Sequence, residues 1–188
     1  TPLSGRVVWN MDPETVTART HMVLRVDLLE GAVLIDCGFG SAVPTGVLDL
    51  VTDIEQPTPH EPFRLVRIGE EWRAQIRIGA EWRTTYRFDL SPQRDIDYVV
   101  ANWYTSTHPD SHFRHGLTLA RSLPGRRISL RGNAFATHRL YGATERRTLT
   151  DPEGIAAIIE NEFGLRVPDR PALLARLRDD LPAMAAAN

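Results

Sequence analysis

Short alternating strands joined by two-residue turns dominate the middle of the chain and constrain its fold most. Three such runs occupy residues 63–68, 72–78 and 82–88, with Gly69-Glu70 and Gly79-Ala80 between them. Glycine accepts the positive φ that tight hairpin turns require, so we expect the three runs to form an antiparallel meander. Regular short strands with tight turns favour a small barrel or sandwich, and we predict a barrel.

The segments before this meander continue the strand pattern. We expect short strands at residues 7–10, 22–28, 32–37 and 47–51, with a hairpin turn at Glu30-Gly31. Together with the meander, they make up a predicted β-barrel domain.

Helical periodicity first appears after the barrel. Ile96, Val99, Val100 and Trp103 recur at the spacing of one helix face. Beyond them we expect strands at about 117–121, 127–131, 135–140 and 144–149, a helix that begins near Asp151 and ends before Gly164, and a weaker helix at 171–181. The predicted class is α+β, with a β-barrel domain at 1–93, an interdomain helix and loop at 94–115, and a small α/β lid domain at 116–188.

Composition excludes several classes of protein. The 188 residues carry a net charge of -2, which gives no general attraction to nucleic acid or to an anionic membrane surface. No apolar run approaches the roughly 20 residues that cross a bilayer. The single cysteine excludes an internal disulfide, so we expect a cytoplasmic protein. The chain does not begin with Met and reads as a strand from Gly5, so we expect it to start inside a longer protein.

His21 and Asp36 are the most interesting polar residues of the predicted barrel. An imidazole that is hydrogen-bonded to a carboxylate keeps one tautomer and becomes a better base for a thiol or hydroxyl. A turn at Glu30-Gly31 places both residues on one face of the hairpin but leaves them about 13 Å apart. Contact then needs a longer turn, a bulge or strong curling, so spacing alone does not establish the pair.

The residues that follow Asp36 each allow two interpretations. Gly38-Phe39-Gly40 is either a plain tight turn or a backbone that passes close to a ligand, with Phe39 lining a pocket. Cys37 is a possible nucleophile, but adjacent strand residues point to opposite faces, so it points away from Asp36. We predict that Cys37 is a small core residue.

No metal site is predicted. His108, His112 and His115 have suggestive spacing, but Pro109 prevents a continuous helix across them and no carboxylate cluster joins them. Loop or pocket histidines are the expectation.

Two early motifs together resemble the arylamine N-acetyltransferase family. The first is Arg19-Thr20-His21 before an alternating strand, and the second is the sequence Leu-Ile-Asp-Cys-Gly-Phe-Gly at residues 34–40, where the family commonly has Val at the position of Cys37. The sequence Asn-Trp-Tyr-Thr-Ser-Thr-His-Pro at 102–109, Phe113 and the strand pair at 131–139 are also similar to the family. The resemblance runs over most of the chain.

The resemblance implies an enzyme with a Cys-His-Asp triad that transfers acetyl from acetyl-CoA to arylamines, arylhydroxylamines or hydrazines. His21 would be the base that activates the cysteine, and Asp36 would orient it. Thr20, Gly38, Phe39 and Gly40 would border the acyl and cofactor pocket, and Phe113 and His138 would line the acceptor or CoA site. The implied fold is an N-terminal helical bundle, a β-barrel and an α/β lid.

The family's nucleophilic cysteine lies in that helical bundle, and no segment of this sequence resembles its surroundings. We therefore expect this chain to be the C-terminal part of such an enzyme, to be inactive alone and to need the helical domain as its partner. Two alternatives stay open: a non-catalytic homologue that binds CoA or an aromatic ligand, and a related amide-forming cyclase.

Overall fold

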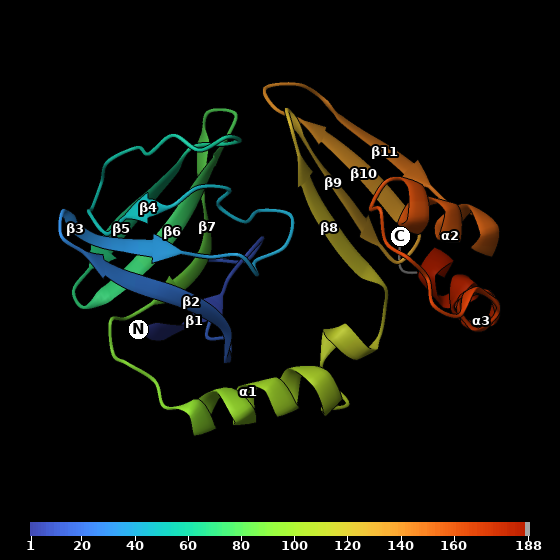
Figure 1. Cartoon of the computed structure of the whole chain (residues 1–188), viewed down its shortest axis with the longest axis horizontal. Coiled ribbons are helices and arrows are strands. Elements are labelled where there is room, and N and C mark those ends of the chain that lie inside the picture. The colour runs from blue at the N-terminus through green and yellow to red at the C-terminus, as the bar shows by residue number, and fades with distance from the viewer. Residues whose placement is uncertain (187–188) are drawn as a thin grey trace. The chain divides into compact units, whose positions relative to one another are not determined.

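The chain folds into two compact units, one formed by Thr1–His108 and the other by residues from Pro109 onward. The computed structural model describes residues 1–186 (Figure 1). Strands and helices both contribute to the fold, so the α+β class is confirmed. The division between the units falls within the segment 94–115 that the sequence predicts to link two domains.

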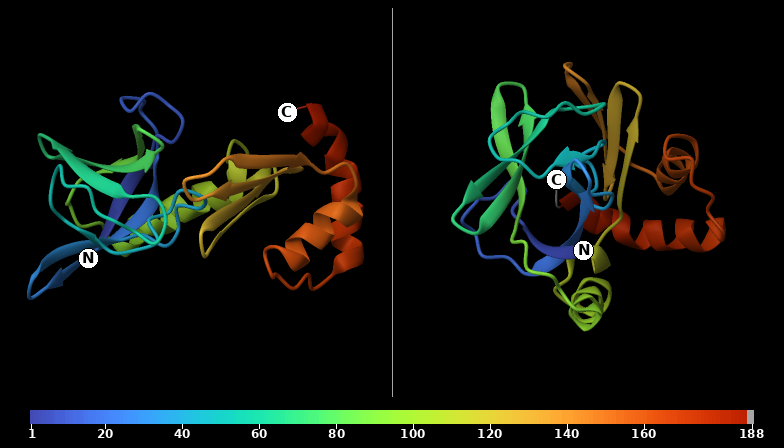
Figure 2. Two further views of the ribbon diagram at one scale, coloured as in Figure 1. Left: turned by 90° about the horizontal axis from the view of Figure 1, so that it is seen from above. Right: turned by 60° about the vertical axis from the view of Figure 1, so that its left-hand side comes forward.

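The first unit is built on one antiparallel sheet of seven strands. The sheet has the strand order β4-β3-β2-β1-β7-β6-β5, and the segment after β4 bridges back to β5 through the pairs Thr52↔Leu65 and Gln56↔Phe63. The sheet therefore curls into a nearly closed barrel (Figure 2). The strands are β1 Pro2–Val7, β2 Arg19–Leu28, β3 Gly31–Ile35, β4 Leu48–Asp49, β5 Phe63–Ile68, β6 Glu71–Ile78 and β7 Glu81–Phe88.

One buried side chain closes the barrel between β4 and β5. The Gln56 side chain accepts a hydrogen bond from the Asp49 backbone N–H at 2.7 Å and donates one to the Asp49 carbonyl at 2.9 Å. An amide buried without partners is costly, and these two bonds satisfy it. Gln56 thus takes the place of a backbone ladder where β4 is too short to supply one.

Two strands end elsewhere than the sequence predicts. The first strand is Pro2–Val7 and not residues 7–10, because the left-handed φ of 58° at Asn10 begins a loop. The strand predicted at 32–37 ends at Ile35. Asp36 and the residues after it therefore belong to a loop, which gives their side chains more freedom than strand alternation allows.

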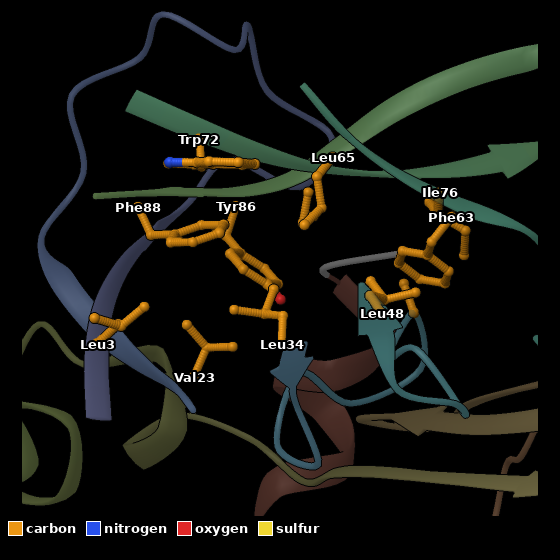
Figure 3. Close-up of a cluster of buried hydrophobic side chains, with 12 residues drawn as sticks. Leu3, Val23, Leu34, Leu48, Phe63, Leu65, Trp72, Ile76, Tyr86 and Phe88 are labelled. Atoms are coloured by element: carbon orange, nitrogen blue, oxygen red, sulfur yellow. The ribbon is translucent and has the colours of Figure 1, made fainter. Parts of the chain in front are cut away.

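The core of the first unit is a cluster of aliphatic and aromatic side chains from both sides of the barrel (Figure 3). Tyr86 and Phe63 are the largest of its fully buried members. Burying one such side chain stabilises the fold by about 1.5–3 kcal/mol relative to leaving it in water. The residues drawn and labelled in Figure 3 are Leu3, Val23, Leu34, Leu48, Phe63, Leu65, Trp72, Ile76, Tyr86 and Phe88.

The first unit also carries two exposed apolar rows. Helix α1, Asp95–Thr107, has no buried residue, and its predicted apolar face of Ile96, Val99, Val100 and Trp103 is 59–64% exposed. On β2, Val23 points into the core, and Met22, Leu24 and Leu28 point outward and are exposed. Isolated exposed apolar residues are ordinary, whereas contiguous rows mark surfaces that bind something.

The second unit packs two helices against a sheet of four antiparallel strands in the order β11-β10-β9-β8. Helix α2 begins where the Asp151 side chain accepts a hydrogen bond from the Gly154 N–H at 2.7 Å, with Pro152 in the first turn. Ile155, Ile158 and Ile159 of α2 pack against Ile128, Leu130 and Phe135 of the sheet. The elements are η1 His112–Arg114, β8 Thr118–Leu123, β9 Arg126–Arg131, β10 Ala134–Arg139, β11 Thr144–Thr148, α2 Pro152–Asn161 and α3 Arg170–Ala186.

Among the helices formed by the described residues, none has the length and apolar character that crossing a membrane requires.

Candidate active site

The hairpin of β2 and β3 brings His21 and Asp36 together. Gly31 is the first residue of β3, so the turn is Leu29-Glu30 and not Glu30-Gly31 as the sequence suggested. This change of register moves Asp36 two residues closer to His21. The two residues become diagonal neighbours on one face of the hairpin. The Cα atoms of such cross-strand neighbours lie about 7–8 Å apart, which is within reach of their side chains.

The resulting contact is a short hydrogen bond between side chains. Nε2 of His21 lies 2.7 Å from Oδ2 of Asp36, and the carboxylate side chain is 0% exposed while the imidazole is 10% exposed. The other carboxylate oxygen accepts a hydrogen bond from the Gly38 N–H at 2.9 Å. A buried carboxylate with partners on both oxygens is held in one orientation, and it holds the imidazole in turn.

This geometry decides which imidazole nitrogen is available for chemistry. Because Nε2 contacts the carboxylate, a neutral His21 carries its proton on Nε2 and keeps Nδ1 as the acceptor. Within residues 1–186, the Nδ1 atom has no hydrogen-bond partner. The pair can therefore take a proton at Nδ1 from a thiol, a hydroxyl or an amine.

Aromatic rings surround the imidazole. The ring of Phe39 lies 5.4 Å from that of His21 in an edge-on arrangement, and the ring of Tyr86 lies 4.7 Å away. Trp9 in turn makes an edge-on contact with Phe39 at 6.3 Å. These rings limit the access of water to His21 and give the site an apolar wall.

Tyr86 is a site residue that sequence reasoning missed. Its ring is fully buried among the apolar side chains of the barrel core (Figure 3), beside His21 and near the Asp36 carboxylate. A β-bulge in β7 lets Ala74 pair with Tyr86 while Gln75 pairs with Thr84. The extra residue breaks strand alternation, so the pattern of residues 82–88 could not show that Tyr86 faces inward.

Burial and the nearby Asp36 carboxylate raise the pKa of Tyr86 well above its ordinary value. Above about pH 10, the unfolded chain loses this phenolic proton and the folded chain keeps it. The free energy of unfolding must then fall as the pH rises. Tyr86→Phe should remove this alkaline loss and change the stability at neutral pH by less than about 1 kcal/mol, because the hydroxyl has no hydrogen bond of good geometry within residues 1–186.

Urea unfolding of both proteins at neutral pH and above pH 10 checks this expectation. Tyr141→Phe is the matched control, because the Tyr141 side chain is 85% exposed and its hydroxyl stays in water. An equal alkaline loss in wild type and Tyr86→Phe would remove Tyr86 from the explanation.

Cys37 is not the core residue that the sequence predicted. It is exposed, because β3 ends before it and the chain bends at this position. The bend is fixed by Asp36, whose side chain accepts the Gly38 N–H across Cys37. No contact joins the thiol to His21 among the described residues.

Replacing this exposed thiol should have little effect. We expect Cys37→Ser and Cys37→Val to change the free energy of unfolding by less than about 0.5 kcal/mol, as exposed substitutions usually do. Any activity of the complete protein should survive both changes. Thermal unfolding and a rate assay test this, and an inactive but folded Cys37→Ser protein would reveal a catalytic thiol here.

The remaining predicted site residues lie in different parts of the chain. Thr20 precedes His21 on β2, and Gly38 and Gly40 flank Phe39, with Gly40 at a φ of 87° that favours glycine. Phe113 and His138 lie in the second unit. The roles inferred for all these residues from the resemblance stay predictions.

His138 and Phe113 each have a defined local setting. Nδ1 of His138 on β10 lies 2.9 Å from the Thr144 hydroxyl on β11. Phe113 lies in η1, is exposed and contacts the ring of His112. In the part of the chain that the structure describes, no group of three or more His, Cys, Asp or Glu side chains could hold a metal ion.

Comparison with known proteins identifies the family of the chain. The sequence profile of the N-acetyltransferase family matches residues 1–172. The chain is 39% identical to an arylamine N-acetyltransferase of Escherichia coli (strain K12) over 168 residues, which are 89% of this chain and 59% of that protein. It is 40% identical to an arylamine N-acetyltransferase of Mycolicibacterium smegmatis over 170 residues, 89% of this chain and 62% of that one.

A solved structure gives the same result. The arylamine N-acetyltransferase of Mycobacterium marinum in complex with CoA superimposes with a TM-score of 0.88 and 37% identity, over 94% of this chain and 67% of that one. The fold and the sequence therefore define the class, and the chain belongs to the arylamine N-acetyltransferase family. It spans 59% and 62% of the two relatives compared above, so it corresponds to part of their length.

Proposed function

We propose that this chain supplies the base and the orienting acid of an acetyl-CoA-dependent N-acetyltransferase that acts on arylamines, arylhydroxylamines or hydrazines. The observation that carries the proposal is the 2.7 Å contact between a shielded imidazole and a fully buried carboxylate. Family membership supports acetyl transfer as the reaction, and a relative solved with CoA supports the donor.

In this proposal the nucleophile is a cysteine thiol from outside these 188 residues. His21 takes the thiol proton at Nδ1, and the thiolate attacks the acetyl carbonyl of acetyl-CoA. The bond to the CoA sulfur breaks, and the leaving thiolate takes the proton from His21. An amine then attacks the acetyl-cysteine, its proton passes to His21, and the cysteine thiolate leaves. Asp36 stabilises the imidazolium in both halves.

The exposed apolar rows of the first unit support a further protein segment as partner. Both the α1 face and the outward residues of β2 are apolar and open to water. We propose that a helical domain of the same protein covers them and delivers the cysteine to His21. Thr20, Gly38, Phe39 and Gly40 would then border the acyl pocket, and Phe113 and His138 would contact the acceptor or CoA. A cytoplasmic location follows only from the cysteine count and stays a prediction.

Acetyl-CoA consumption in the presence of a simple arylamine or hydrazine tests this function. The protein for this assay is the product of the complete reading frame that contains Thr1–Asn188. Acceptor-dependent release of free CoA thiol is expected. A protein that binds CoA but releases no thiol with any acceptor class would instead indicate a non-catalytic homologue.

A further inference from the structure

The loop between β1 and β2 connects the aromatic wall of the site, at Trp9, to the strand that carries His21. It leaves the barrel at Trp9, which contacts Phe39, and returns at Arg19, two residues before His21. Any movement of this loop therefore acts on the wall of the site and on the strand that carries the imidazole. The contacts that hold the loop in place therefore affect the geometry of the aromatic wall and of the strand that carries His21.

Short-range bonds fold the loop on itself. The Glu14 N–H donates to the Asp12 carboxylate at 2.8 Å, and the Thr15 N–H donates to the Asp12 carbonyl at 2.9 Å. The Thr17 hydroxyl donates to the Val7 carbonyl at 2.9 Å. These bonds give the loop a compact shape but tie it only to its own strand β1.

Two buried arginines, on the next two strands of the sheet after β1, β7 and β6, fasten the loop to these strands. Arg73 lies 2.7 Å from a carboxylate oxygen of Glu14, and Arg87 lies 3.7 Å from the other oxygen. Arg87 also donates to the Thr15 carbonyl at 2.9 Å. The two guanidinium side chains are only 11% and 9% exposed, so each needs a partner that replaces water.

A second carboxylate belongs to the same ring of charges but not to the loop. Glu71, on β6 itself, lies 3.0 Å from Arg73 and 3.2 Å from Arg87. The four side chains alternate in sign around the ring. Burial lowers the pKa of Arg73, and the two carboxylates raise it by more, so its pKa is above the ordinary value. Glu71 stabilises the buried pair, and Glu14 is the carboxylate that connects the pair to the loop, beside the bond from Arg87 to the Thr15 carbonyl.

We propose that Glu14 is a positioning residue, which fixes the β1–β2 loop and through Trp9 and β2 sets the aromatic wall of the site around His21. The kinetic part rests on the function proposed above. The structural part, that Glu14 and not Glu71 restrains the loop, does not depend on it.

Glu14→Gln and Glu71→Gln form a matched pair for the test. Both remove one charge from the same ring, and only the first weakens the tether to the loop. Backbone amide exchange of residues 11–18 should rise about fivefold to tenfold in Glu14→Gln, because local opening becomes easier, and should stay near wild type in Glu71→Gln. Glu14→Asp should restore part of the protection.

Kinetics of the complete protein supply the second readout. KM for the acceptor amine should rise about fivefold in Glu14→Gln with a smaller change in kcat, because the aromatic wall that the acceptor must approach is loosened while the His21–Asp36 contact is kept. Equal changes in both variants, or unchanged exchange in Glu14→Gln, would overturn the proposal and leave the ring a purely structural device. If the wild type shows no acetyl transfer, the proposed function fails, and the exchange result still decides the role of Glu14.

Discussion

His21→Ala and Asp36→Asn should each lower acetyl transfer by the complete protein on the order of 10⁴-fold, the loss seen when a triad member is removed. In the first variant no group takes the thiol proton. In the second, the neutral amide can still accept the Gly38 N–H but no longer stabilises an imidazolium at Nε2, and it can turn the ring toward the wrong tautomer. Steady-state rates of free CoA thiol release measure both effects.

A control must separate lost chemistry from lost structure. Asp27→Asn makes the same chemical change as Asp36→Asn on β2, the strand that carries His21, at an exposed side chain that pairs with Arg25. It should keep nearly full activity. Thermal unfolding should show that all the variants fold. Near-normal turnover in folded His21→Ala or Asp36→Asn would remove that residue from the mechanism.

The isolated 188-residue chain should show no acetyl transfer above background. Its single cysteine, Cys37, is exposed and makes no contact with His21 among the described residues, and a base with an orienting acid cannot form an acetyl-enzyme without a nucleophile. The exposed faces of α1 and β2 should also cause self-association or poor solubility. Acetyl-CoA consumption and sedimentation of the isolated chain measure both expectations.

Adding the proposed helical domain tests the same expectation in the opposite direction. If that domain is made separately with the proposed cysteine, it should bring back turnover and reduce self-association when mixed with this chain. The same domain with that cysteine changed to Ser should reduce self-association without turnover. Robust turnover by the 188-residue chain alone would contradict the account.

Local sequence signals predicted the regular part of the barrel well. Strand β5 has the predicted bounds, and β6 and β7 begin one residue early, because glycines at positions 69 and 79 adopt the positive φ that two-residue turns need. The helix α1 was predicted for a similar reason, since its apolar spacing is regular. These features depend on residues close together in the sequence, so local sequence patterns can predict them.

The active-site geometry was harder to predict because it depends on small shifts of register. Gly31 was expected inside the turn, but it opens β3 with a φ of 139°, and the turn consists of Leu29-Glu30. Because the turn lies one residue earlier than predicted, His21 and Asp36 are in direct contact and not about 13 Å apart as the sequence suggested. The position of Tyr86 depended on a bulge in β7, which has no local signature in the sequence.

The resemblance to the family identified His21 and Asp36 as partners where local geometry left the pair open. It did not identify Tyr86, and it did not reveal that Cys37 is exposed. Strand alternation suggested a buried thiol because it assumed that β3 continues to residue 37. The position at which β3 ends therefore decided the environment of Cys37 more than the apolar sequence around it did.

The position of the acetyl group on the enzyme tests the central claim most directly. The complete protein would be mixed with acetyl-CoA without an acceptor, quenched in acid, digested and analysed by mass spectrometry. The account predicts one acetyl group on a cysteine that precedes Thr1 in the wild type, and almost none there in Asp36→Asn over the same time. An acetyl group on Cys37, or equal labelling of the wild type and Asp36→Asn, would contradict the claim that His21 and Asp36 activate a thiol from outside this chain.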